Sequence, residues 1–375
     1  MLSAGLVARL HGLGLSSPWR AQAKSTNTTA EYCAARECGP IGMLASRTMS
    51  TAQRLPPRFA GLILTATLAA VAAAGEPLYV ASDHVGDGTF TTGVEGPATG
   101  PDGALYAVNF AREGTVGRVT MDAGVVHAQW FVDLPGDSVG NGIRFDARGH
   151  MYVADYIGHR VLRIDPGDRS ITVHAHDRRM HQPNDIAIAP DGTLYASDPR
   201  WSHGDGQLWR IDTDGGTHLL ETGMGTTNGI EVSPDGRRLY VNESVQRRVW
   251  VYDIGQQGAL SGKRLLIRFD DHGLDGMRTD AAGNLYIARY GAGTVAIVSP
   301  DGVLLHEVPL KGALPTNVAF GGQDGHSVFV TLQDRGAIER FRSAWPGRET
   351  GGHGAAGSGA APALSPPAGA GRGTP

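Results

Sequence analysis

The chain has 375 residues and a formal net charge of −4; hydrophobic residues make up 41% of it and charged residues 19%. So mild a charge, without long runs of Lys or Arg, argues against a nucleic-acid-binding face. Both cysteines, Cys33 and Cys38, lie near the N-terminus. This excludes disulfides, thiolate metal sites and a cysteine nucleophile from the rest of the chain.

Residues 49–74 have the layout of a secretory signal peptide. Arg54 and Arg58 form a basic segment, residues 60–71 form an apolar core, and residues 72–74 are alanines suited to cleavage. The apolar core is shorter than the roughly 20 residues that a membrane span needs, although an uncleaved N-terminal anchor is the alternative. We therefore expect an exported protein, periplasmic or extracellular, with no membrane partner after cleavage.

The two ends of the chain differ from its middle. Residues 1–48 show no clear periodicity, and we interpret them as an unstructured extension; Met43 or Met49 would be the natural start of the signal, which makes the preceding residues a candidate mis-start. Residues 347–375 are rich in Gly, Ala and Pro, which predicts a disordered tail. The globular part is thus predicted to span residues 75–346.

The globular part repeats one pattern six times: a polar residue, a short apolar strand, a tight turn and a second apolar strand, as in residues 274–290. The opening polar residue lies at positions 95, 141, 184, 228, 275 and 316, in steps of 46, 43, 44, 47 and 41 residues. Asp-Gly pairs, such as those at 191–192 and 301–302, separate the apolar runs and are typical of hairpin turns. A period in the forties made of short strands predicts an all-β, six-bladed β-propeller.

The sixth copy ends with a strand at residues 337–341 and has no fourth strand before Pro346. An unassigned apolar strand at residues 77–81 would supply it. We predict that these two strands pair, because closing the ring in this way removes an exposed sheet edge.

In a propeller the innermost strand of each blade lines a central channel, so residues at one repeat position form a ring around it. The predicted ring is Glu95, Asn141, Asn184, Asn228, Asp275 and Thr316. Two carboxylates and several amide oxygens suit a hard divalent cation such as Ca²⁺. Alternatively, Asn-Gly and Asp-Gly at strand starts merely satisfy turn geometry; the spacing alone leaves both interpretations open.

Four of the copies resemble the metal-site motifs of the senescence marker protein-30/gluconolactonase/luciferin-regenerating family. The motifs are Glu95-Gly96-Pro97, Pro183-Asn184-Asp185, Thr227-Asn228-Gly229-Ile230 and Leu274-Asp275-Gly276-Met277. The resemblance covers roughly residues 77–342. It implies a six-bladed propeller with one divalent ion in the channel mouth, usually Ca²⁺, with Zn²⁺, Mg²⁺ or Mn²⁺ as other options. It also implies that the ligands are Glu95, Asn184, Asn228 and Asp275, and that the activity is hydrolysis of a small-molecule lactone or related ester.

The same resemblance makes Asp275 the catalytic residue, either as general base for water or as direct nucleophile. Asn141 and Thr316 lie on the ring but outside the four motifs, so we predict that they contact substrate or hold the ligands in position; Asn317 has the same status. An enlarged hairpin at residues 198–206 extends the third copy. We predict that it overhangs the channel and selects the substrate, with a solvated loop as the alternative; its candidate residues are Arg200, Trp201 and His203.

Some residues depart from the family pattern. Gln182 stands where some sugar-lactone members have Arg, which puts a sugar-acid lactone in doubt. His181 and His272 each lie three residues before a ring position and are weaker candidates for proton carriers. Two other functions stay open: a non-catalytic NHL-type propeller that binds a ligand or protein, and a phosphotriesterase-type hydrolase using the same site. The chain has no Gly-x-Ser-x-Gly elbow, which argues against a serine hydrolase of the α/β type.

Overall fold

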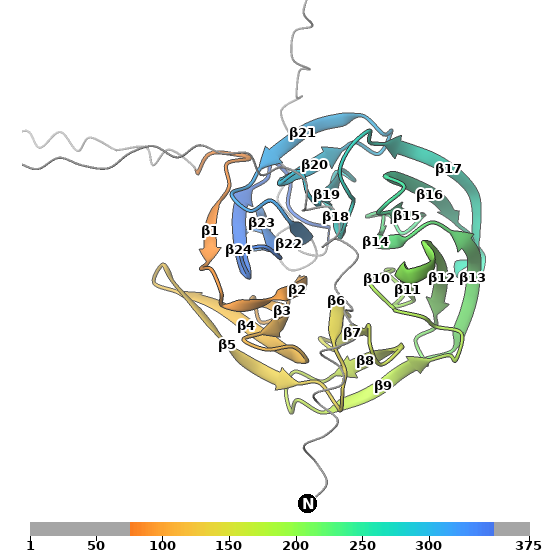
Figure 1. The fold of residues 1–375 in the computed structure, drawn as a ribbon, viewed down its shortest axis with the longest axis horizontal. Coiled ribbons are helices and arrows are strands. Elements are labelled where there is room, and N and C mark those ends of the chain that lie inside the picture. Colours follow the sequence, from red (N-terminus) through yellow and green to blue (C-terminus); the bar gives the residue numbers. More distant parts are fainter. Residues whose placement is uncertain (1–75, 349–375) are drawn as a thin grey trace, which may run out of the picture. The chain divides into compact units, whose positions relative to one another are not determined.

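A computed structural model describes residues 76–348, which lie in the second of two compact units, the one that begins at Glu76. These residues form six four-stranded antiparallel sheets around a common axis (Figure 1), so the predicted six-bladed β-propeller is confirmed. The predicted N-terminal extension, signal peptide and most of the tail lie outside the described residues. Within residues 76–348, no helix combines the length and the apolar composition that crossing a membrane would require.

Each blade runs from an innermost strand at the channel to an outermost strand at the rim (Figure 1). The innermost strands are β2 (Phe90–Thr99), β6 (Gly140–Phe145), β10 (Ile186–Ile188), β14 (Thr227–Val232), β18 (Met277–Thr279) and β22 (Pro315–Gly321). The second strands are β3 (Leu105–Phe110), β7 (Met151–Asp155), β11 (Leu194–Arg200), β15 (Arg238–Glu243), β19 (Leu285–Arg289) and β23 (Ser327–Leu332).

The third strands are β4 (Thr115–Asp122), β8 (Arg160–Ile164), β12 (Asp205–Ile211), β16 (Arg248–Ile254), β20 (Thr294–Val298) and β24 (Ala337–Arg342). The outermost strands are β5 (Val125–Asp133), β9 (Ile171–His176), β13 (Thr217–Met224), β17 (Leu260–Arg268), β21 (Leu304–Pro309) and β1 (Ser82–Val85). Two single-turn 3₁₀ helices, η2 (Trp201–His203) and η3 (Gln256–Gly258), interrupt the loops.

Burial of a strand follows its place in the blade. All five residues of β19 are buried, whereas five of the six residues of β21 are exposed. The inner strands lie between neighbouring blades, and their apolar side chains form six clusters in the described residues, one at each interface between blades. The core is therefore a ring of apolar layers that leaves the axis to polar side chains.

The blades are closed by β1 pairing with β24, with Ser82 opposite Arg340 and Val85 opposite Ile338. This confirms the predicted closure, but the predicted strand residues 77–81 were wrong. Tyr79 has φ +61°, which breaks an extended strand, and its ring stacks on His306 at 4.6 Å. The chain therefore makes one isolated bridge, from Leu78 to Arg342, before the closing strand begins.

At the other end, the chain continues beyond the predicted boundary at residue 346. Gly347 forms an antiparallel bridge with Asp280, and Arg348 donates its backbone N–H to the Thr279 carbonyl at 3.2 Å. Residues 347 and 348 thus belong to the propeller rather than to the predicted tail.

Candidate metal centre

Five of the six predicted ring residues lie within two positions of the start of an innermost strand, and Glu95 lies midway along β2, opposite Val108. Antiparallel pairing places the starts of β6 and β14 beside the ends of β7 and β15, with Gly140 opposite Asp155 and Thr227 opposite Glu243. Asn184 and Asp275, which come just before β10 and β18, hydrogen-bond through their backbone N–H groups to the second strands of their blades. We call the end of the propeller where the innermost strands begin the site face, and the opposite end the far face.

The glycines that follow ring residues allow neighbouring innermost strands to approach closely. A Cβ on Gly276 would lie 1.9 Å from Asn317 Cγ, and one on Gly142 would lie 2.4 Å from Asp185 Oδ1. Gly142 N–H also donates to the Asn184 carbonyl at 2.8 Å, which joins two blades. Neither glycine has a positive φ, so turn geometry is not the reason that they follow an Asn or an Asp.

Two buried carboxyl groups meet in the ring. Burial raises the pKa of Glu95 to about 7, with the Asp185 charge adding to the rise. Burial also raises the pKa of Asp275 well above its usual value, and the Glu95 charge acts in the same direction. Two buried carboxylates so close together require a proton or a cation between them.

Several ring oxygens have no hydrogen-bond partner although they are buried. They are Asn141 Oδ1, Asn184 Oδ1, Asn228 Oδ1 and Asp275 Oδ1. Because buried polar atoms are nearly always hydrogen-bonded, four unpartnered oxygens on one ring indicate a missing ligand, and an all-oxygen set fits a hard divalent cation. No group of three or more His, Cys, Asp or Glu side chains that could hold a metal ion occurs in residues 76–348; the ring offers two carboxylates together with amides instead.

The Thr316 hydroxyl makes contacts within the protein, and its predicted contact with substrate stays a prediction. It donates to the Val94 carbonyl at 2.9 Å and lies 2.8 Å from Thr331 Oγ1. It therefore joins the sixth blade to the first. Asn141 keeps its unpartnered oxygen on the ring, and its contact with substrate stays a prediction.

The enlarged hairpin joins β11 to β12 on the site face. Arg200 pairs with Asp205 across the hairpin, with Nε 3.0 Å from Oδ1, so its charge is used within the loop. Trp201 is partly buried and His203 is exposed. Substrate selection by these three residues stays a prediction, as do the weaker proton-transfer roles of His181 and His272.

Tyr290 is a site residue that the sequence pattern did not reveal. It is buried at the end of β19, and its hydroxyl hydrogen-bonds to Gln333. Burial raises the pKa of Tyr290, and the charges of Asp275 and Glu95 contribute. The Tyr290 side chain therefore lies within electrostatic reach of both carboxyls. The residue closes the 274–290 copy, but no feature of the repeat distinguishes it.

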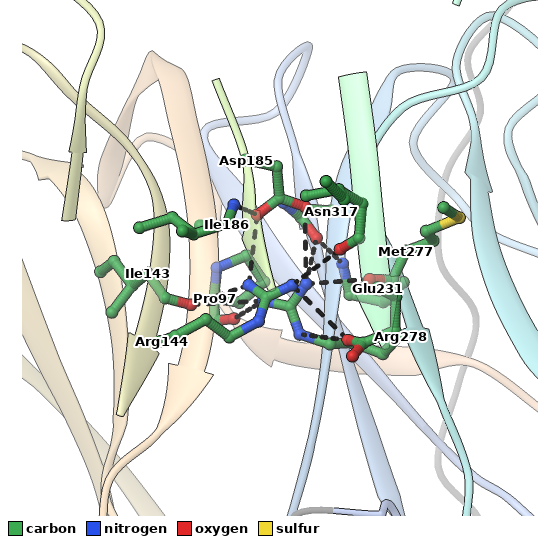
Figure 2. Close-up of polar contacts among 12 residues, drawn as sticks. Pro97, Ile143, Arg144, Asp185, Ile186, Glu231, Met277, Arg278 and Asn317 are labelled. Carbon is green, nitrogen blue, oxygen red and sulfur yellow. Dashed lines mark hydrogen bonds and ion pairs between the residues drawn. The ribbon is translucent and has the colours of Figure 1, made fainter. Parts of the chain in front are cut away.

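A buried layer of four charged side chains and one amide lies next to the ring, with the amide hydrogen-bonded to Glu95 (Figure 2 shows the layer). It consists of Arg144, Asp185, Glu231, Arg278 and Asn317, all at most 3% exposed. A signal for part of it exists in the repeats: the residue three positions after the ring residue is Ala in three copies and Arg, Glu or Arg in the other three. We call these five residues the channel cluster.

These features define a propeller with an oxygen-lined channel mouth, and comparison with known proteins identifies the family. Residues 94–334 match the SMP-30/Gluconolactonase/LRE-like region. The chain therefore belongs to this family, as its motifs predicted.

Curated relatives include the gluconolactonase of Zymomonas mobilis, 28% identical over 215 residues, which are 51% of this chain and 60% of the relative. The pentonolactonase of Haloferax volcanii is 34% identical over 175 residues, 46% of this chain and 60% of the relative. The chain thus matches about 60% of the length of these two relatives.

Among solved structures, a calcium-binding regucalcin from Agrobacterium tumefaciens has a TM-score of 0.61 at 21% identity, covering 73% of this chain and 96% of that one. A gluconolactonase from Xanthomonas campestris has a TM-score of 0.59 at 22% identity, covering 68% and 87%. At these identities the similarity establishes the fold.

Proposed function

We propose that this protein is an exported, calcium-dependent hydrolase of a small lactone or related carboxylic ester. The observation that supports it best is the ring: two neighbouring buried carboxyls, together with buried amide oxygens that have no partner, occupy equivalent repeat positions of different blades. A scaffold propeller would gain no stability from such a set. Relatives named gluconolactonase and pentonolactonase support a lactone as the class of substrate.

The residues that would hold the ion are Glu95, Asn184, Asn228 and Asp275. When bound, a divalent ion supplies Lewis-acid polarisation of the substrate carbonyl and stabilises the negative charge that develops on its oxygen. The Asn228 side chain acts to lower the pKa of Asp275, which favours the ionised form of that carboxyl. Asn317 donates to Glu95 Oε2 at 3.2 Å and Gly96 N–H does so at 2.9 Å, so two donors orient the Glu95 carboxylate.

In this proposal Asp275 moves the proton. As general base it takes a proton from water while the water oxygen bonds to the lactone carbonyl carbon. The C–O bond within the lactone then breaks, and the departing alkoxide takes the proton back from Asp275 to give the hydroxy acid. Its Oδ1 has no protein partner, so one carboxylate oxygen is available; direct attack by Asp275 on the carbonyl is the other route.

The test is hydrolysis of a lactone panel with Ca²⁺ and with a chelator, for the wild type and for Asp275→Asn. We expect chelation to abolish activity and the substitution to lower kcat/KM by about 10²–10⁴-fold, because it removes the proton acceptor. Asp271→Asn is the control, since that side chain is 71% exposed four positions upstream. Activity that survives both the chelator and Asp275→Asn would contradict the proposal.

A second candidate comes from one relative. The diisopropyl-fluorophosphatase of Loligo vulgaris is 26% identical over 280 residues, which are 66% of this chain and 88% of that protein. Adding a fluorophosphate to the panel separates the two candidates. Cleavage of that compound, with every lactone left intact, would favour a phosphotriesterase-type enzyme; a protein that binds Ca²⁺ and cleaves neither would favour a non-catalytic propeller.

A further inference from the structure

The last described residues, 343–348, run across the far face of the channel, and we call them the C-terminal strap. The Pro346 carbonyl accepts the Ala281 N–H at 2.7 Å, and Gly347 N–H donates to the Gly325 carbonyl at 3.0 Å. The fit is close, because a Cβ on Gly347 would lie 2.2 Å from Phe320 Cβ. The strap is therefore held by the fifth and sixth blades at the end opposite the candidate metal centre.

Arg348 reaches from the strap to a buried acid of the channel cluster. Its Nη2 lies 2.6 Å from Glu231 Oε1 and its Nε 2.8 Å from the same oxygen. Nη2 also donates to the Ile188 carbonyl at 2.9 Å. Since Glu231 is fully buried, this charge-assisted contact largely determines how its negative charge is balanced.

Glu231 also lies against the two arginines of the channel cluster (Figure 2). Glu231 Oε2 lies 3.6 Å from Arg144 Nη2 and 4.0 Å from Arg278 Nε. Arg278 in turn donates from Nη1 to Asn317 Oδ1 at 3.3 Å. The three guanidinium groups thus share Glu231, and one of them also holds Asn317.

Arg278 and the Val318 N–H together fix which end of the Asn317 amide faces the ring. Asn317 Oδ1 accepts from Arg278 and from the Val318 N–H at 2.9 Å. The NH₂ group is therefore directed to Glu95 Oε2 at 3.2 Å and to Asp185 Oδ2 at 3.4 Å. With the amide reversed, an oxygen would face two carboxylates, and Glu95 would lose a donor.

We propose that Arg348 is a positioning residue for the candidate metal centre, acting through Glu231, Arg278 and Asn317 on the Glu95 carboxylate. The proposal rests on the proposed function, in that Glu95 holds the ion. Without Arg348, the buried charge of Glu231 relies on its longer contacts with Arg144 and Arg278. Arg278 is then drawn toward Glu231 and away from Asn317, and one of the two donors that orient Glu95 is weakened.

The experiment measures Ca²⁺ affinity by isothermal titration calorimetry on the full chain. We expect Arg348→Ala to weaken binding about tenfold, the lower end of the effect of removing a group that orients a metal ligand. Arg348→Lys keeps a cation near Glu231 and should recover part of the loss. Arg342→Ala is the matched control, because Arg342 pairs with Asp324 outside the channel at 2.6 Å.

Unchanged or tighter binding by Arg348→Ala would overturn the positioning role; tighter binding is what simple removal of a nearby positive charge would give. Asn317→Ala provides a second line of evidence. If Arg348 acts through Asn317, the double variant should lose little more affinity than either single variant. If the fold-losses of the two single variants multiply in the double variant, the two residues act independently, and the proposed path from Arg348 to Asn317 is overturned.

The outcomes separate this inference from the proposed function. A wild type that binds no divalent cation overturns both. A wild type that binds Ca²⁺, with Arg348→Ala equal to it, overturns the positioning role alone. A wild type that binds Ca²⁺ and cleaves no ester overturns the hydrolase, while a weakened Arg348→Ala still supports the positioning role.

Discussion

Asn184 shows how a single buried side chain can reveal a ligand site. It is 4% exposed, yet its Oδ1 has no partner. An asparagine kept for stability would be hydrogen-bonded, because an unsatisfied buried amide costs about 1–3 kcal/mol. Its unpartnered oxygen is explained if the side chain serves a ligand from outside the chain.

Asn184→Ala should therefore lower Ca²⁺ affinity without lowering the stability of the metal-free protein. Asn109→Ala is the opposite case: Asn109 is buried too, but its amide donates to the Gly93 carbonyl at 2.6 Å and accepts from Gly114 N–H at 3.1 Å. We expect it to lose about 1–3 kcal/mol of unfolding free energy and to bind Ca²⁺ normally. Urea unfolding in chelator measures the stability of each variant, and isothermal titration calorimetry measures its Ca²⁺ affinity. A destabilised Asn184→Ala would point to a structural role instead.

Gly276 tests the close approach of the innermost strands. Its added Cβ would overlap the Asn317 side chain, which four hydrogen bonds hold in place. We expect Gly276→Ala to cost about 1–3 kcal/mol of stability through overpacking and to weaken Ca²⁺ binding, because Asn317 must move away from Glu95. Gly86→Ala, with nothing within 4 Å of the new Cβ, should match the wild type. Equal behaviour of the two variants would show that this contact does not matter.

At the level of elements, the closing strand β1 carries a pH-sensitive group. Burial lowers the pKa of His84 to about 4, and the Arg340 charge contributes; its ring lies 4.7 Å from that of Phe329. In the unfolded chain the pKa is 6.5. The folded state therefore binds fewer protons than the unfolded state between pH 6.5 and 4, and the stability that neutral His84 contributes is lost as the pH falls through this window.

His84→Phe should reduce this loss, since phenylalanine keeps the ring contact and does not titrate. The measurement is Tm from pH 7 to pH 4.5 for the wild type and the variant. As the pH falls, we expect the Tm of the variant to drop less than the Tm of the wild type. His127→Gln, at an exposed position of β5, should follow the wild-type slope. Parallel curves for the wild type and His84→Phe would contradict the assignment.

The same strand shows where reasoning from sequence reaches its limit. The missing fourth strand of the last copy predicted closure by an N-terminal segment, because a ring of sheets has one edge to fill. The residues of that strand were not predictable, because Tyr79 leaves the extended conformation to stack on His306. That contact joins residues that are distant in the sequence, so it cannot be predicted from local β-propensity.

Over the whole molecule, the repeat alone placed Glu95, Asn141, Asn184, Asn228 and Asp275 on one ring, because equal repeat positions lie at equal depth in the channel. The channel cluster escaped prediction for a related reason. Arg144, Glu231 and Arg278 occupy one repeat position, but whether they pair with each other or face solvent depends on how the copies oppose one another across the axis. Arg348 lies outside the repeats, and no pattern links it to Glu231.

A bound ion held by four different blades should stabilise the whole propeller. A ligand at about 100 times its Kd adds about 2.7 kcal/mol to the unfolding free energy. For a domain of this size, each kcal/mol raises Tm by about 2–4 °C, so we expect Ca²⁺ to raise Tm by about 5–10 °C over the chelated protein. The Asp275→Asn variant should show little of this rise, because it loses a charged ligand; differential scanning calorimetry measures both. An equal rise in the variant would place the ion elsewhere, and no rise in the wild type would mean that the unpartnered ring oxygens do not bind it.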